Sequence, residues 1–301
     1  MTVINAKAVA DLREKTGAGM MDCKKALVET AGDLEAAVDF LRKKGLAATA
    51  KKAGRITAEG LVAVVTNGTT GAVLELNSET DFVAKNDKFQ FLAASLAKNF
   101  IAHSGDFESF KAANTDQIAE NIAVIGENMT LRRAEKLSVS KGAVISYVHN
   151  AIATGLGKIG VLVALESDAS EDKLTQLGKQ IAMHIAATRP ESLNVSELDP
   201  ALVAKERAFI VDQAKSSGKP DAVIEKMVEG RLVKFYEQVV LTEQLFVMDG
   251  KTRISQVIED AGKQIGASIK ITGFIRYNIG EGIEKKEVDF AQEVAAAAAG
   301  A

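Results

Sequence analysis

Apolar side chains in the first 45 residues recur every three to four positions, which predicts three short helices. Asn5 can cap the first helix, and Gly17 can end it in the left-handed conformation that glycine adopts at low cost. The second helix starts with residues 20–27 and is expected to end near Gly32. Asp33 caps the third, and we expect Gly45 to end it. These residues therefore predict a compact helical module.

Residues 46–55 begin with one large apolar side chain and contain no other. Their remaining side chains are small, polar or basic. We therefore expect a basic linker here, which would place the helical module, residues 1–54, on a tether.

Beyond this segment the apolar spacing changes to that of strands. Residues 61–65 and 71–76 predict a β-hairpin whose Asn67-Gly68 turn supplies the positive φ angles. A polar stretch, residues 78–86, follows the hairpin. The next helix is predicted from four apolar residues at helical spacing: Phe89, Leu92, Leu96 and Phe100.

The same order of elements then recurs. Residues 142–148 and 158–165 predict a second strand pair, and a helix follows with an apolar stripe of Leu174, Leu177, Ile181 and Ile185. Aligning Gly71 with Gly160 also matches Ser78 with Ser167. We interpret this as a duplicated strand–strand–helix unit. The fold class is α+β, with two related subdomains containing antiparallel sheets, residues 55–141 and 142–282.

All three prolines lie within 31 residues: Pro190, Pro200 and Pro220. Pro190 ends the preceding helix, because proline lacks the amide donor and clashes with the previous turn. Residues 201–216 and 221–236 then predict two antiparallel helices, an arm inserted at about 190–236. A final helix beginning at Asp289 belongs to a C-terminal module, residues 283–301.

Composition agrees with a globular protein. Of 301 residues, 47% are apolar and 26% charged, which is enough to form a core. No apolar run approaches the roughly 20 residues of a membrane span, and the N-terminus has no apolar signal region. Cys23 has no cysteine partner within the chain. A reducing, cytoplasmic location is therefore expected.

The charge of the chain indicates little about its partners. The chain carries a net charge of −3, which does not favour nucleic-acid binding. Residues 1–55 contain 11 basic and 7 acidic side chains, a local charge of +4. That basic segment is either a solvated face or a contact surface.

Side-chain catalysis is not indicated. None of the three histidines, His103, His149 and His184, has another histidine nearby in the sequence, and no nucleotide-binding or hydrolase motif occurs. His184 lies beside an apolar stripe, which favours a half-buried core histidine over a ligand. His149 ends a predicted strand, and this position favours neither a core role nor a functional role. We expect no catalytic residue, metal or cofactor.

Two apolar features could instead contact a partner. Phe82 is either an exposed aromatic anchor or, seven residues before Phe89, part of a buried helix face. Met20 and Met21 either adapt to a partner surface or fill a core. The nearby charges of Arg13 and Lys24 favour contact with a partner.

Several segments closely resemble the bacterial elongation factor Ts family. Residues 16–27 (TGAGMMDCKKAL) resemble its N-terminal signature, and residues 77–85 (NSETDFVAK) resemble its second signature. Further similar stretches occur in order along the chain, at 126–128, 181–184, 226–231 and 280–284. The departures are small: Ser78-Glu79 replaces a pair such as Cys-Gln, and the loop at 151–157 is longer than in short members.

This resemblance implies a guanine-nucleotide exchange factor for the GTPase elongation factor Tu. It implies that residues 1–54 are similar to ubiquitin-associated three-helix domains. Three residues of this module would contact the partner: Arg13, Met20 and Met21. The loop residues Thr80, Asp81, Phe82 and Val83 would dislodge Mg²⁺ from the partner, and His149 would press near its phosphate loop.

The arm resembles the family's protruding coiled coil, where two copies of the chain could associate as a homodimer. Two other classes of function stay open on the residues alone. One is a ribosome- or RNA-associated translation accessory protein without exchange activity. The other is a small-molecule enzyme with an unrecognised site. An exchange factor makes and breaks no covalent bond, which agrees with the absence of an acid–base constellation.

Overall fold

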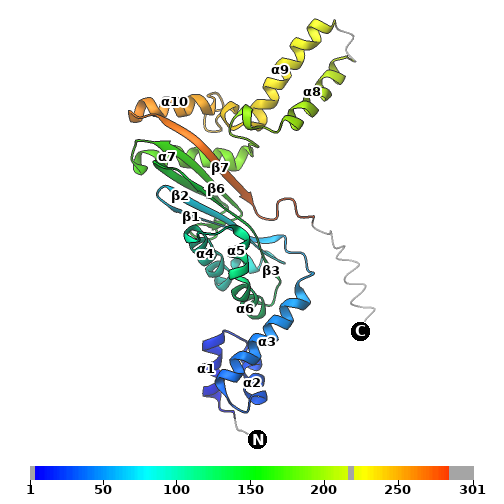
Figure 1. The fold of residues 1–301 in the computed structure, drawn as a ribbon, viewed down its shortest axis with the longest axis vertical. Coiled ribbons are helices and arrows are strands. Elements are labelled where there is room, and N and C mark those ends of the chain that lie inside the picture. The colour runs from blue at the N-terminus through cyan, green and yellow to red at the C-terminus, as the bar shows by residue number, and fades with distance from the viewer. Residues whose placement is uncertain (1–3, 216–219, 285–301) are drawn as a thin grey trace.

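The computed structural model describes residues 4–215 and 220–284. Runs of helices and runs of strands follow one another along the chain, and the strands form two antiparallel sheets (Figure 1), which confirms the α+β class. The helices are α1 (Ala6–Thr16), α2 (Met20–Glu29), α3 (Leu34–Lys52), α4 (Asp87–Ala102), α5 (Phe107–Ala113), α6 (Thr115–Ile125), α7 (Glu171–Thr188), α8 (Pro200–Lys215), α9 (Asp221–Val239) and α10 (Ile254–Ile265). The strands are β1 (Glu59–Asn67), β2 (Thr70–Ser78), β3 (Met129–Ser138), β4 (Gly142–His149), β5 (Leu156–Gly157), β6 (Ile159–Ser167) and β7 (Ile269–Asn278). Single 3-10 turns are η1 (Val83–Lys85), η2 (Val195–Glu197) and η3 (Leu241–Glu243).

The N-terminal three-helix module folds around its own small core. The Asn5 side chain accepts a hydrogen bond from the Ala8 amide at 2.7 Å, and Gly17 ends α1 with a φ of +66°. Leu12, Cys23 and Leu27 are completely buried between the helices. The three predicted helices of this module are therefore confirmed, as are the caps at Asn5, Gly17 and Asp33.

The predicted tether is wrong, because α3 does not end at Gly45. It continues to Lys52 and packs against α6. A Cβ at Gly45 would lie 3.0 Å from the Ala123 Cβ, so the missing side chain lets the two helices approach closely. The Lys52 Nζ donates to the Gly126 carbonyl at 2.6 Å. Alanine and lysine are strong helix formers, which explains why the small, basic segment is helical.

The first sheet has the order β3-β2-β1-β5 and the second β4-β6-β7. The predicted β1–β2 hairpin is confirmed, but Asn67 pairs with Thr70 as the last residue of its strand. The two loop residues are thus Gly68 and Thr69. Gly68 has a φ of +59°, and the expectation that Asn67 shares a positive φ is wrong.

The two halves repeat the same unit in detail. In the first half β2 shifts register against β3 between Glu75 and Leu76. In the second, β6 shifts against β7 between Ala164 and Leu165. These positions are equivalent when Gly71 is aligned with Gly160. The common irregularity supports duplication of a strand–strand–helix unit.

The sheets pack face to face, and helices cover their outer faces (Figure 1). Val62, Val73 and Leu162 belong to the apolar cluster between the sheets. A Cβ at Gly160 would lie 2.6 Å from the Val62 side chain, so glycine is needed for this close contact. Phe89 of α4 is buried against the first sheet and Leu174 of α7 against the second.

A buried carboxylate joins the two halves. Glu75 on β2 is inaccessible to solvent and pairs with Arg132 at 3.0 Å and Arg133 at 2.6 Å. The Gly280 amide, beyond β7, donates to it at 2.8 Å. Burial alone raises the pKa of Glu75, but hydrogen bonds, including those from Gly280 and Asn77, outweigh it and hold that pKa below its ordinary value.

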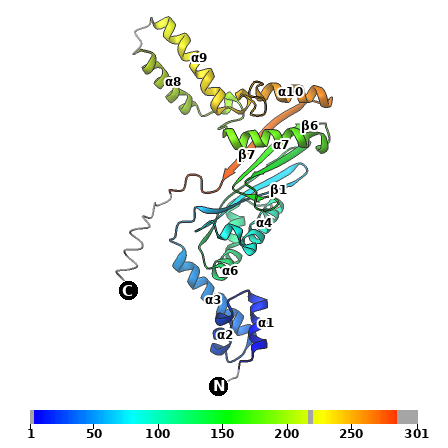
Figure 2. The same cartoon turned by 180° about the vertical axis from the view of Figure 1, so that it is seen from behind.

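The predicted arm is confirmed where the structure describes it. Helices α8 and α9 pack together through Ile210, Val228 and Leu232. The arm and the N-terminal module lie at opposite ends of the molecule (Figures 1 and 2). The joint at 216–219 and the predicted helix from Asp289 lie outside the described residues. No helix of the described part has the length and apolar content of a membrane span.

Candidate functional site

The loop at residues 79–86 connects β2 to α4 and presents Phe82 to solvent. The Phe82 side chain is 76% exposed, whereas Val83 and Ala84 beside it are buried in the core. Asn86 is extended and its side chain caps α4 by accepting from the Lys88 amide at 3.0 Å. The helix therefore starts after the loop. The alternative in which Phe82 shares a buried helix face is wrong.

Hydrogen bonds fix the base of this loop. Glu127 accepts from the Thr80 amide at 2.9 Å and from the Thr80 hydroxyl at 2.6 Å. Glu79 accepts from the Asn128 amide at 2.5 Å and pairs with Arg55 at 3.2 Å. Bonds to a charged acceptor are stronger than neutral ones, so the loop base is held firmly.

The tip carries the exposed side chains of Asp81 and Phe82. Sequence reasoning assigned no role to Glu127. The signal that could have found it is the segment 126–128, which resembles the family sequence.

The N-terminal module presents a second apolar group. Met20 is 57% and Met21 75% exposed at the start of α2, so neither belongs to the module core. Arg13 is also exposed. Cys23 is buried, with its Sγ 3.7 Å from the Ala18 carbonyl, and is a core residue.

A direct contact links the module to α4. The Lys88 Nζ donates to the Gly17 carbonyl at 3.4 Å, at the C-terminal end of α1. A positive charge is favourable at that end because of the helix dipole. Lys88 thus holds the turn that leads to Met20 against the helix that follows the 79–86 loop.

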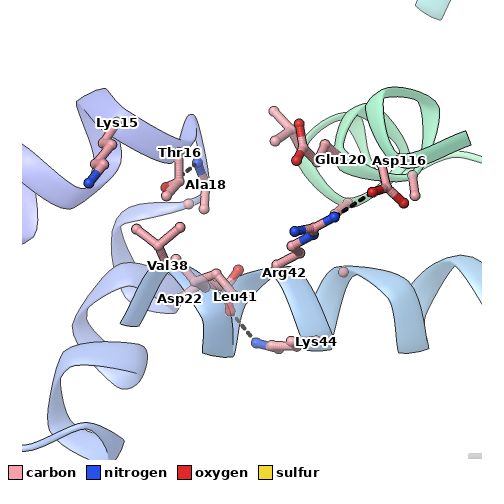
Figure 3. A pocket seen from close by; sticks show the side chains of 15 residues that line it. Lys15, Thr16, Ala18, Asp22, Val38, Leu41, Arg42, Lys44, Asp116 and Glu120 are labelled. Carbon is pink, nitrogen blue, oxygen red and sulfur yellow. Dashed lines mark hydrogen bonds and ion pairs between the residues drawn. The ribbon is translucent and has the colours of Figure 1, made fainter. Parts of the chain in front are cut away.

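A cleft of about 320 Å³ lies between the module and α6 (Figure 3). Arg42 reaches from α3 across this cleft to Asp116 on α6, while Lys44 pairs with Asp22 on α2 at 2.5 Å. The Arg42–Asp116 pair and the α3–α6 packing fix the module on the core, whereas the Lys44–Asp22 pair joins two helices within the module.

The two histidines named as candidates have different surroundings. His149 is exposed at the end of β4, with its Nδ1 3.1 Å from the Tyr147 hydroxyl. Within the described residues no hydrogen bond or ion pair joins it to the 79–86 loop. His184 is fully buried rather than half-buried, with its Nε2 2.9 Å from the Gln244 Oε1. Its Nδ1 accepts from the Val247 amide, so His184 is a neutral core residue.

Comparison with known proteins matches residues 79–281 to the family model for elongation factor TS. Elongation factor Ts of Rhodospirillum rubrum is 59% identical, covering 98% of this chain and 99% of that protein. The protein of that name from Paramagnetospirillum magneticum is 58% identical (99% and 98%), and that from Rickettsia bellii 56% identical (97% and 97%).

These matches place the chain among translation elongation factors. More narrowly, it belongs to the elongation factor Ts family. Membership implies nucleotide exchange on elongation factor Tu, which is a binding activity. The alignments with these relatives cover nearly the whole chain and therefore also the N-terminal module, which precedes the residues 79–281 matched by the family model.

Proposed function

We propose that this chain binds elongation factor Tu in its GDP form, displaces the bound Mg²⁺ and so promotes GDP release. The observation that carries the proposal is the Phe82 ring, 76% exposed on a loop whose neighbouring residues are anchored. A rigid base lets the ring push on a partner instead of yielding to it. Thr80 and Val83 hold the loop, while Asp81 and Phe82 contact the partner.

The required energy is within reach of such a loop. Loosening GDP about a thousandfold takes roughly 4 kcal/mol of differential binding. Fully burying one phenylalanine contributes about 1.5–3 kcal/mol. Mg²⁺ bridges nucleotide phosphate oxygens, so displacing its ligands removes a large part of the nucleotide affinity. The factor and GDP then weaken each other's binding reciprocally.

The remaining energy comes from contacts elsewhere. Met20, Met21 and Arg13 bind the nucleotide domain of the GTPase from the N-terminal module. His149 adds a contact near the phosphate loop of the partner. The fixed position of the module supports this division, because anchors on a rigid body bind without a further ordering cost.

The test is release of fluorescent GDP from purified elongation factor Tu. Wild-type protein should accelerate release strongly, and Phe82→Ala should lower the maximal release rate at least tenfold without changing thermal unfolding. Phe209→Ala is the matched control, since Phe209 is 57% exposed on α8 of the distant arm. A Phe82→Ala protein that is as active as wild type would show that the ring does not drive release.

A further inference from the structure

Helix α4 carries a second exposed aromatic ring close after the 79–86 loop. Phe91 is 74% exposed, nearly as much as Phe82. It lies on the solvent side of α4, opposite the buried Phe89 and Leu92. Its neighbour one turn later is the exposed Ala94, which is too small to cover the ring.

Phe91 has no evident role in the stability of this fold. It belongs to no buried cluster, and within the described residues it makes no aromatic or cation–π contact. An exposed ring on a helix surface loses hydrophobic stabilisation that burial would provide. A polar residue would serve a solvated helix face equally well.

Helix α7 in the second half of the molecule is the counterpart of α4, and its exposed face can be compared with that of α4. An offset of 85 residues superposes six buried positions of α4 on six buried positions of α7, beginning with Phe89 on Leu174. The same offset places Phe91 on Gln176, which is also exposed. The equivalent position in the second half is therefore polar, and Phe91 is specific to the half that contains the 79–86 loop.

The helix that carries Phe91 is connected to both apolar groups already described. Lys88, one turn earlier on α4, bonds to Gly17, and Gly17 is three residues from Met20. On the other side, the chain from Phe82 to Phe91 spans at most roughly 25 Å by backbone length. A standard interface buries about 800 Å² per partner, a patch roughly 30 Å across. One partner surface can thus cover both Phe82 and Phe91.

We propose that Phe91 is a further anchor for the same GTPase, inserting into an apolar pocket beside the one that receives Phe82. The inference rests on the proposed function and divides the work between the two rings. Phe82 acts on the nucleotide site, whereas Phe91 contributes equally to binding before and during release. Uniform binding of this kind lowers the half-saturating concentration and leaves the maximal rate unchanged.

The experiment measures GDP release against concentration for wild type, Phe91→Gln, Phe91→Leu and Phe209→Ala. Phe91→Gln introduces the residue found at the equivalent position of α7. We expect its half-saturating concentration to rise about tenfold at an unchanged maximal rate, as for a typical aromatic anchor. Phe91→Leu should recover part of the affinity, and Phe209→Ala should equal wild type.

The outcomes separate the two proposals. An unchanged half-saturating concentration for Phe91→Gln, with active wild type, overturns the Phe91 anchor and leaves the exchange function standing. A lower maximal rate would assign Phe91 to the release step and overturn the division stated here. Wild type that does not accelerate release overturns the proposed function itself. Direct titration of Phe91→Gln with nucleotide-free elongation factor Tu would still test the anchor in that case.

Discussion

The two halves of the molecule differ most where a strand is joined to the following helix. In the first half, β2 is connected to α4 by eight residues, 79–86; in the second, β6 is connected to α7 by three, 168–170. Each strand before these connections ends with a serine that bonds to the backbone two residues later. Ser78 donates to the Thr80 carbonyl at 2.9 Å, and Ser167 accepts from the Ala169 amide at 3.1 Å.

The comparison shows how one scaffold acquires a contact site. The longer connection places Val83 and Ala84 in the core, and this burial directs Phe82 outward. The shorter one packs only Ala169 against its core and carries no aromatic residue. Sheets, register shift and helix packing are common to both halves, so the added loop residues carry the proposed difference in function.

The largest effect should come from making the two connections alike. Replacing residues 79–86 with Asp-Ala-Ser, the sequence of 168–170, should reduce GDP release to the rate of elongation factor Tu alone. The physical reason is loss of both the ring and its anchored base. The measurement is fluorescent-GDP release.

A second variant guards against unfolding of the shortened chain. It keeps Val83 and Ala84 but replaces residues 80–82 with Gly-Ser-Gly, which preserves the buried pair. If either folded variant still accelerates release, the loop is not the source of the activity.

A smaller effect is expected from loosening the loop without shortening it. Glu127→Gln removes the charge from the acceptor of both Thr80 hydrogen bonds, each of which is a charge-assisted bond. We expect the maximal release rate to fall about tenfold, since bonds to charged groups contribute about 1.5–3 kcal/mol. Partner affinity, measured by calorimetry, should change little. Glu225→Gln on the exposed side of α9 is the control; equal rates for both variants would argue against a rigid base.

The smallest effect concerns a histidine present in only one half. The offset that aligns the helices places buried His184 on exposed Asn99. Burial lowers the pKa of His184, partly offset by its hydrogen bond with Gln244. As pH falls below about 6.5 the unfolded chain binds a proton that the folded chain does not. The stability contributed by neutral His184 is therefore complete above that pH and decreases below it.

Denaturant unfolding at pH 7.5 and 5.5 measures this loss. His184→Gln should reduce the pH dependence of the free energy of unfolding. Identical pH profiles for wild type and His184→Gln would contradict the assignment of His184 as a neutral core residue.

Much of the fold was predictable because it depends on local periodicity. The β1–β2 hairpin, the apolar stripes of α4 and α7 and the paired helices of the arm all follow from spacing alone. Two helices, α5 and α6, and strands β3 and β5 were not predicted. In β3 the charged Arg132 and Arg133 mask the alternation, and their place becomes clear only beside the buried Glu75.

The candidate site was predictable in part. The sequence singles out Phe82, Met20 and Met21, but spacing alone permits both buried and exposed positions for them. The outcome for Phe82 depends on the Asn86 cap, which starts α4 after the loop, and on burial of Val83. Phe91 was overlooked because an aromatic residue next to a helical apolar stripe resembles a continuation of that stripe.

The continuous helix α3 has one further consequence. At 1.5 Å per residue its 19 residues form a rod of about 28 Å that connects the N-terminal module to the sheets. A flexible connection would let Met20 and Phe82 reach a partner independently and would lose chain entropy when both were bound. Here that entropy is lost during folding, so the spacing of the two contacts is fixed before the partner binds. Only a partner whose size and shape match this spacing can bind both contacts at once.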